Sequence, residues 1–105
     1  MRLSQVEVEV KVEGAILADN YSLSPAYPNP FNATLTLPFM LQERMNVEIS
    51  LYDVSGRMVK QVVNQSISAG DYSLRVNSDE LSSGLYIIKI IMNQSTHYQR
   101  VVLLK

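Results

Sequence analysis

Apolar residues recur at every second position along most of this 105-residue chain. Residues 6–12 alternate valine with charged residues, and positions 35–41, 47–51 and 72–76 repeat the same spacing. A period of two places alternate side chains on opposite faces of a β-strand. No stretch keeps the helical period of ~3.6 residues for long enough to form the helix of a β–α–β unit. The chain is therefore predicted to be all-β.

Turn signals separate these runs. Asp53-Val54-Ser55-Gly56 has Asp at the first and Gly at the last position of a type I turn, in which Asp53 is expected to cap its own turn. Ala69-Gly70-Asp71 and Asn93-Gln94-Ser95 mark two further turns. Short strands with turn signals every ~8–12 residues are typical of antiparallel sandwiches. We predict an immunoglobulin-like antiparallel β-sandwich of about seven strands.

Prolines interrupt the pattern at two places. Pro25, Pro28 and Pro30 lie close together, which excludes a helix or a central strand there, because proline fixes φ and has no N–H group. Pro38 lies inside the 35–41 run and predicts that this strand is at an edge or contains a bulge. The Asn77–Leu81 stretch offers at most one helical turn.

Composition excludes several classes of function. The chain has no cysteine and one histidine, His97, so disulfides, Cys-based zinc sites and sites with two imidazoles are excluded. His97 lies near the last hairpin turn and is expected to be exposed. A net charge of −1 gives no electrostatic reason to expect nucleic acid as a partner. No apolar run approaches the ~20 residues of a membrane-spanning helix, and we expect no cofactor.

Two features allow more than one interpretation. In the Leu85–Met92 segment, isoleucines surround Lys89, so this strand is either covered on both faces or exposes an apolar docking patch. Four tyrosines in the predicted strands are expected to pack in the core or on a face of the sandwich, with a sugar-stacking platform as the alternative. These are Tyr52, Tyr72, Tyr86 and Tyr98.

Short motifs in a fixed order carry a family resemblance. They are Tyr-Pro-Asn-Pro-Phe-Asn at 27–32, Tyr-Asp and Gly-Arg within 52–57, Ala-Gly at 69–70, Leu-Ser-Ser-Gly-Leu-Tyr at 81–86, and a basic-apolar-Lys ending at 100–105. From about Tyr21 to Lys105 the chain resembles the type A C-terminal sorting domains of the bacterial type IX (Por) secretion system, seen in Bacteroidetes and relatives. Ala33, where a further proline is common, and Pro38 depart from the family pattern. The motif residues carried over are Tyr27, Pro28, Asn29, Pro30, Phe31, Asn32, Asp53, Gly56, Arg57, Gly70, Gly84, Tyr86, Arg100, Val101, Val102, Leu103, Leu104 and Lys105.

The resemblance implies a non-catalytic secretion signal that an outer-membrane translocon reads as a folded domain. Residues 21–105 would form the sorting domain, and residues 1–20 would be a strand and connector from the preceding region of a longer protein. A sortase-like peptidase would then remove the domain from its N-terminal, covalently attached cargo, at the cell surface or outside the cell. The expected cleavage region is Gly14, Ala15, Ile16, Leu17, Ala18, Asp19 and Asn20. The resemblance implies neither nucleic-acid binding nor a membrane span, and it leaves a weak homodimer open.

Three other functions compete with this one. A structural immunoglobulin-like spacer or assembly module, like the related domain of flagellar hook-capping proteins, predicts that the last few residues are dispensable for export. A carbohydrate-binding module of a secreted multidomain enzyme predicts a row of exposed tyrosines. An enzyme would need a cleft that joins His97 to an acidic residue.

Overall fold

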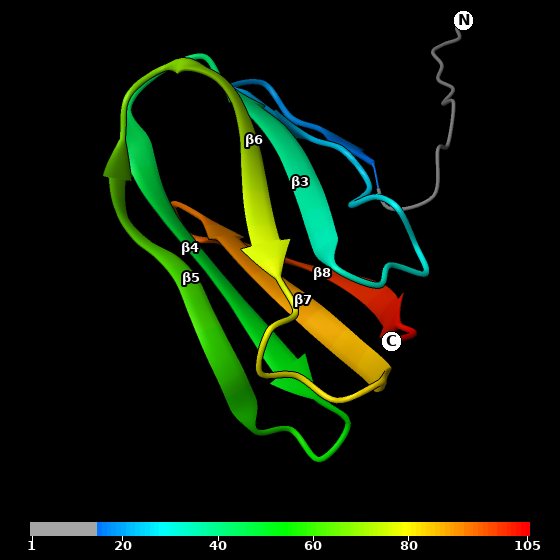
Figure 1. Ribbon diagram of the computed structural model, residues 1–105. Coiled ribbons are helices and arrows are strands. Elements are labelled where there is room, and N and C mark those ends of the chain that lie inside the picture. The colour runs from blue at the N-terminus through cyan, green and yellow to red at the C-terminus, as the bar shows by residue number, and fades with distance from the viewer. Residues whose placement is uncertain (1–14) are drawn as a thin grey trace, which may run out of the picture.

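The computed structural model describes residues 15–105 as two four-stranded antiparallel sheets packed face to face (Figure 1). This confirms the all-β sandwich, here with eight strands, while the strand predicted at 6–12 lies outside the described residues. One sheet has the order β1-β2-β3-β6 and the other β5-β4-β7-β8. The strands are β1 (Ile16–Leu17), β2 (Tyr21–Leu23), β3 (Thr34–Leu41), β4 (Met45–Asp53), β5 (Met58–Ile67), β6 (Gly70–Asn77), β7 (Gly84–Met92) and β8 (Ser95–Leu103).

The alternating residues become the core between the two sheets. In β3 the apolar side chains at 35, 37, 39 and 41 are buried, and in β4 those at 45, 47, 49 and 51 face them from the other sheet. Leu35, Ile49, Ile90 and Leu103 have no exposed surface. Burying each such side chain contributes about 1.5–3 kcal/mol, so these alternating faces supply the main force that holds the sheets together.

Pro38 lies in an inner strand, so the prediction of an edge position for the 35–41 strand is wrong. β3 has β2 on one side and β6 on the other, and its pairing with β6 is continuous. The carbonyl of Pro38 accepts the N–H of Ser24 at 3.0 Å, immediately after β2 ends at Leu23. Its ring nitrogen faces the same side, where the strand partner has ended. The missing N–H group therefore costs the sheet no ladder bond.

Two turns differ in how well the sequence predicted them. Gly56 N–H donates to the carbonyl of Asp53 at 3.0 Å, which confirms the turn between β4 and β5. The 77–81 stretch does not form a helical turn: Leu81 N–H donates to Ser78 O at 3.0 Å in a single reverse turn. Asn77 Oδ1 accepts the N–H of Asp79 at 3.4 Å, and the buried hydroxyl of Ser78 donates to the carbonyl of Asn32 at 3.1 Å, so a distant loop also fixes this turn.

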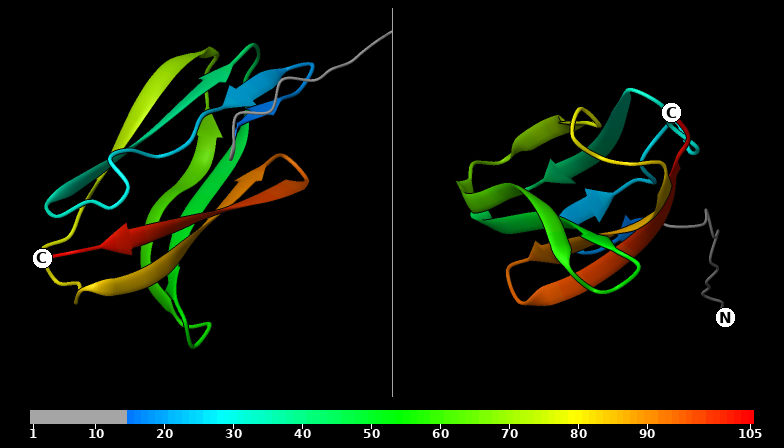
Figure 2. Two further views of the ribbon diagram at one scale, coloured as in Figure 1. Left: turned by 90° about the vertical axis from the view of Figure 1, so that its right-hand side faces the viewer. Right: turned by 60° about the horizontal axis from the view of Figure 1, so that its bottom comes forward.

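The segment between β2 and β3, residues 24–33, stays beside β3 as far as Tyr27, which pairs with Thr36, and only then leaves its own sheet. It crosses to the other layer and runs beside β8, as the views in Figure 2 show. The predicted exclusion of helix and central strand from this proline-rich segment is confirmed. This crossing brings the 27–32 motif to the C-terminal end of the chain.

Candidate recognition site at the proline segment and the C-terminal strand

The backbone of Phe31 adds a short extra rung to the edge of β8. Phe31 N–H donates to Val102 O at 2.9 Å, and Leu104 N–H donates to Phe31 O at 2.8 Å. The bridge is parallel and centred on Leu103. The Phe31 ring is 1% exposed, so it anchors this contact in the core.

The side chain of Asn29 continues the same rung. Its Nδ2 donates to Arg100 O at 3.0 Å, and its Oδ1 accepts the N–H of Val102 at 3.0 Å. A carboxamide carries one donor group and one acceptor, as a peptide unit does. Pro28 and Pro30 on either side have no N–H, so the asparagine side chain supplies the pairing that their backbone cannot. Together, Asn29 and Phe31 occupy the open edge of β8; we call this contact the clasp.

A third residue, Gln99, joins the two segments and was not among the residues predicted from the sequence. It is 8% exposed on the inner face of β8. Its Oε1 accepts the N–H of Ala26 at 2.8 Å, and its Nε2 donates to Ser24 O at 3.0 Å. Buried amides need such partners because an unpaired polar group is costly in the core. A polar residue at an inward position of an apolar strand was the only hint in the sequence.

His97 does not behave as an exposed turn residue, so that prediction is wrong. It lies in β8, half-buried, with its Nε2 2.6 Å from Oη of Tyr21 in β2. The two rings are also in edge-to-face contact, with centroids 5.7 Å apart. The pair ties β2 of one sheet to β8, the edge strand of the other sheet.

The six C-terminal motif residues divide into two sets. Val101 and Leu103 are 1% and 0% exposed and belong to the core, whereas Leu104 is 56% exposed. Lys105 is also exposed; its N–H donates to Ser83 Oγ at 2.9 Å and its Nζ reaches Asp79 O at 3.5 Å. A hollow of about 410 Å³ lies next to them, lined by Pro28, Pro30, Phe31, Asn32 and Leu104. The proline segment and the chain end therefore form one continuous surface.

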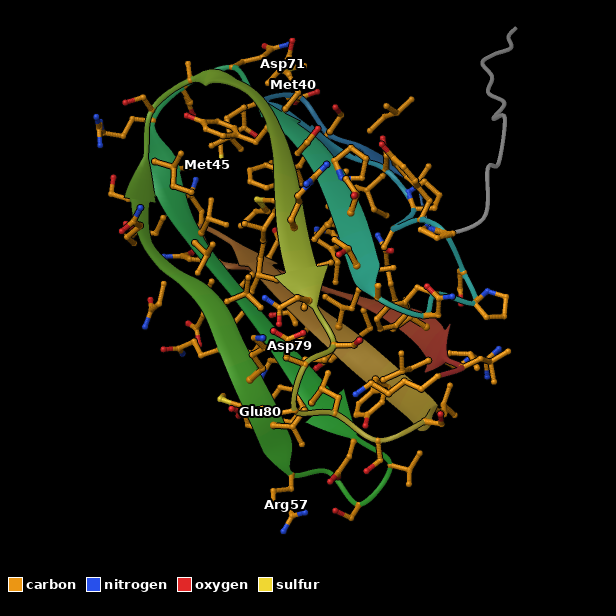
Figure 3. The ribbon with its side chains drawn as sticks, in the orientation of Figure 1. Met40, Met45, Arg57, Asp71, Asp79 and Glu80 are labelled. Carbon is orange, nitrogen blue, oxygen red and sulfur yellow. The ribbon has the colours of Figure 1, made fainter. Side chains whose placement is uncertain are left out.

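The β4–β5 turn has a structural explanation of its own. Asp53 Oδ1 accepts hydrogen bonds from the hydroxyl and N–H of Ser55 at 2.6 and 2.9 Å and from Arg57 N–H at 3.1 Å. These hydrogen bonds hold the pKa of Asp53 below its ordinary value of 3.8. The bond from the Ser55 hydroxyl has the largest effect, and the bond from the Arg57 N–H has the next largest. Arg57 lies 3.5 Å from the carboxylate and points away from the sandwich (Figure 3). Gly56 has φ of 88°, which explains why the turn uses glycine.

The other motif residues lie at two ends of the sandwich. Tyr86 pairs with Asp53 on one side and Val101 on the other, and Gly84 pairs with Leu103, so both are near the chain end. The Tyr86 hydroxyl donates to Ser82 O at 2.6 Å. Tyr27 pairs with Thr36 and is 55% exposed beside the hollow. Gly70 pairs with Leu41 at the opposite end, so the fold does not bring it to this site.

The four strand tyrosines and the connector have mixed surroundings. Tyr86 is in the core and Tyr72 stacks on Phe39 with centroids 5.2 Å apart, as core packing predicts, while Tyr98 is 63% exposed. In the connector, Gly14 lies outside the described residues, and Leu17, Ala18 and Asp19 are exposed.

Within residues 15–105, no three His, Cys, Asp or Glu side chains come together to hold a metal ion. The same part of the chain has no helix long and apolar enough to cross a membrane.

Comparison with known proteins gives one family. No curated protein sequence matches the chain. A family model described as the secretion system C-terminal sorting domain matches residues 25–104, which is the span from the proline segment to the end of the clasp. Domains of this family are signals for type IX secretion, are in general non-catalytic, and take proteins through the periplasm to the cell surface or the extracellular space. The chain therefore belongs to the secretion system C-terminal sorting domain family.

Proposed function

We propose that the type IX machinery reads this domain as a folded shape, and that the surface it reads is the hollow beside the chain end. The observation that carries the proposal is the clasp, in which Asn29 and Phe31 bond to β8 at Arg100, Val102 and Leu104. The family motif at 27–32 and the family ending at 100–105 are thereby parts of one structure. Their co-occurrence in a sorting signal then has a physical reason.

The burial of alternate residues in the 100–105 segment argues against its recognition as a linear peptide. Val101 and Leu103 are in the core, so a partner of the folded domain reaches only alternate residues of this segment. The exposed residues at the hollow are Pro28, Pro30 and Leu104, and Lys105 is exposed at the chain end. A rigid apolar surface of this kind suits a receptor that accepts many unrelated cargoes, because it is the same whatever precedes it.

We further propose that residues 21–105 are the sorting domain and that a sortase-like peptidase cuts within 14–20. Leu17 is 86% exposed, and Ala18 and Asp19 are exposed beside it. β1 has two residues and only β2 as a partner, so extending it into a peptidase cleft breaks few contacts. In this scheme the domain itself catalyses nothing, and its cargo is attached on the N-terminal side.

Export of a reporter tests the proposal. Residues 1–105 are fused to a periplasm-directed fluorescent protein in a bacterium that has the type IX route. A deletion of residues 100–105 would also remove Val101 and Leu103 from the core, so its failure would not separate recognition from folding. The informative variant is Leu104→Ser with Lys105→Ser, which changes exposed side chains only. Its control is Gln42→Ser with Asp71→Ser, two exposed positions at the opposite end (Figure 3 labels Asp71).

The expected result is export of the parent fusion and of the control, with the Leu104/Lys105 variant retained in the periplasm. Mass spectrometry of the exported parent should find a new terminus within residues 14–20. Export of the Leu104/Lys105 variant at the parent level would overturn the hollow as the recognition surface. Retention of the correctly folded parent would overturn the sorting function of this chain.

A further inference from the structure

The outer face of the β5-β4-β7-β8 sheet is not covered by any element within residues 15–105. The two sheets form only two layers, and the far side of β7 and β8 faces away from the other sheet (Figure 2). In β7, alternate residues from Tyr86 to Met92 are buried, whereas Leu85, Ile87, Lys89 and Ile91 point outward and are only partly buried. The strand is therefore not covered by another element on both faces, and its outer face forms an apolar surface on which Leu85 is exposed and Ile87, Lys89 and Ile91 are half-buried.

A shallow hollow lies on this face beside the β4–β5 turn. It has a volume of about 430 Å³ and is lined by Tyr52, Asp53, Val54, Gly56, Ile87, Lys89 and Tyr98. Tyr52 lies opposite Ile87 on one neighbouring strand, and Tyr98 lies opposite Lys89 on the other. Tyr98 and Val54 are 63% and 74% exposed. We call this surface the β7–β8 face. A contiguous exposed apolar surface with two tyrosines is typical of a protein-binding site.

The charged residues that β7 and β8 contribute to this face, Lys89 and Arg100, are both positive. Lys89 stands at its centre, with Nζ 5.9 Å from the centroid of the Tyr52 ring, and it forms no salt bridge within the described residues. Arg100 is exposed on β8 opposite Ile87. No Asp or Glu occurs from Leu81 to Lys105. Of the two acids near this face, Asp53 is engaged by Ser55 and Arg57, and Glu48 lies beyond Lys89, opposite Ile91.

These groups select one kind of occupant. A sugar platform needs several exposed aromatic rings, but Tyr52 is half-buried with Lys89 over its ring, which leaves Tyr98 as the one exposed ring in the lining of this hollow. A second copy in a symmetric dimer would bring Lys89 and Arg100 against the same residues of its partner, which like charges oppose. A protein surface that is apolar and carries carboxylates has neither difficulty.

We propose that the β7–β8 face is a second docking surface for the type IX machinery, complementary to an apolar, acidic protein surface. This inference rests on the proposed function and adds a contact on a different part of the domain from the Leu104 hollow. The surface at the chain end carries one cation, Lys105, and the β7–β8 face adds two more, Lys89 and Arg100. Charge complementarity of this kind chiefly sets specificity and the rate of association.

Charge reversal at the centre of the face tests the inference. In the export assay, Lys89→Glu should lower the amount of exported reporter about tenfold. Lys89→Arg, which keeps the positive charge, should be exported at the parent level. Ile87→Thr, which keeps a β-branched side chain, should also lower export. The matched control is Arg75→Glu, the same charge reversal at an exposed position of β6 in the other sheet. Thermal unfolding of each purified variant verifies that the sandwich is intact.

A photocrosslink identifies what covers the face. Tyr98 is exposed, so a benzoylphenylalanine in its place is expected to be tolerated. The inference predicts a crosslink to an outer-membrane protein of the type IX machinery that Lys89→Glu abolishes. Crosslinks only to a second copy, to lipid or to polysaccharide would overturn it.

The outcomes separate this inference from the proposed function. If the parent fusion is exported and the Leu104/Lys105 variant is retained, the proposed function stands. If Lys89→Glu and Ile87→Thr are then exported as well as Arg75→Glu, the β7–β8 face is not a docking surface. If the folded parent is retained in the periplasm, the proposed function fails and the inference fails with it.

Discussion

The Oε1 atom of Gln99 accepts a hydrogen bond from the N–H of Ala26 at 2.8 Å, across 73 residues of sequence. The Nε2 group of the same side chain donates a hydrogen bond to Ser24 O at 3.0 Å. With Asn29 and Phe31, this makes the proline segment a cap on the free edge of β8. An uncapped edge strand exposes backbone groups that pair with other chains, so the cap protects the domain as well as shaping its signal.

Loss of the Gln99 amide should destabilise the domain. Gln99→Ala leaves the Ala26 N–H and Ser24 O without partners at a buried site, which costs about 2–3 kcal/mol in the free energy of unfolding. Urea unfolding followed by tyrosine fluorescence measures this, with Gln94→Ala in the exposed β7–β8 turn as control. Equal unfolding midpoints for the two variants would show that the amide contributes nothing.

Truncation of Phe31 should have the larger effect on stability. Its ring is 1% exposed, so Phe31→Ala opens a cavity and costs about 3–5 kcal/mol, whereas Phe31→Leu costs less because it fills most of the space. The same unfolding experiment gives both values. A loss below about 1 kcal/mol for Phe31→Ala would mean that the proline segment is not anchored by this ring.

The pH dependence of stability should report on Asp53. Its folded-state pKa is held below the ordinary 3.8, chiefly by the Ser55 hydroxyl, so the carboxylate stabilises the folded state fully above that ordinary value. This contribution is lost as the pH falls through the folded-state pKa. The stability difference between the parent and Asp53→Asn should therefore be largest near neutral pH and shrink below about pH 4.

Denaturant titrations at a series of pH values verify that prediction. Asp71→Asn serves as the control, because it removes one exposed carboxylate at the opposite end of the sandwich. A stability difference for Asp53→Asn that grows toward acid would reverse the sign and refute the assignment.

Replacing the turn glycine Gly56 with another residue should destabilise the folded domain. At φ of 88° an L-residue is strained, although no heavy atom lies within 4 Å of an added Cβ. Gly56→Ala should therefore cost about 1–2 kcal/mol from the backbone alone. Gly56→Asn should cost less, since asparagine visits positive φ more readily. Equal losses for the two variants, measured by thermal unfolding, would point to a clash rather than to backbone strain.

Removing the hydroxyl of Ser50 should leave the domain at least as stable as the parent. It is 2% exposed, and its Oγ has no hydrogen-bond partner in the part of the chain that the structure describes. Ser50→Ala removes this unpaired group and should leave stability unchanged or raise it by up to about 1 kcal/mol. The exposed Ser73→Ala in β6 is the matched control. A clear loss of stability for Ser50→Ala would show that the hydroxyl is bonded after all.

The sequence by itself determined the local features of this protein. The period of two at 35–41 and 47–51 predicted which side chains are buried, because strand geometry alone assigns alternate residues to opposite faces. Asp53 and Gly56 predicted their own turn, since its hydrogen bonds join residues within the turn. The short motifs predicted the family and, with it, the function.

Only the tertiary structure decided what distant segments do to one another. It placed His97 against Tyr21, made Gln99 and Asn29 into an edge cap, and put Pro38 in an inner strand beyond the end of β2. It also left one face of β7 uncovered, where the apolar run 85–92 was equally consistent with burial on both faces. The physical reason is that hydrophobic periodicity is local, whereas strand order, edge pairing and the coverage of a face depend on contacts between residues far apart in the chain.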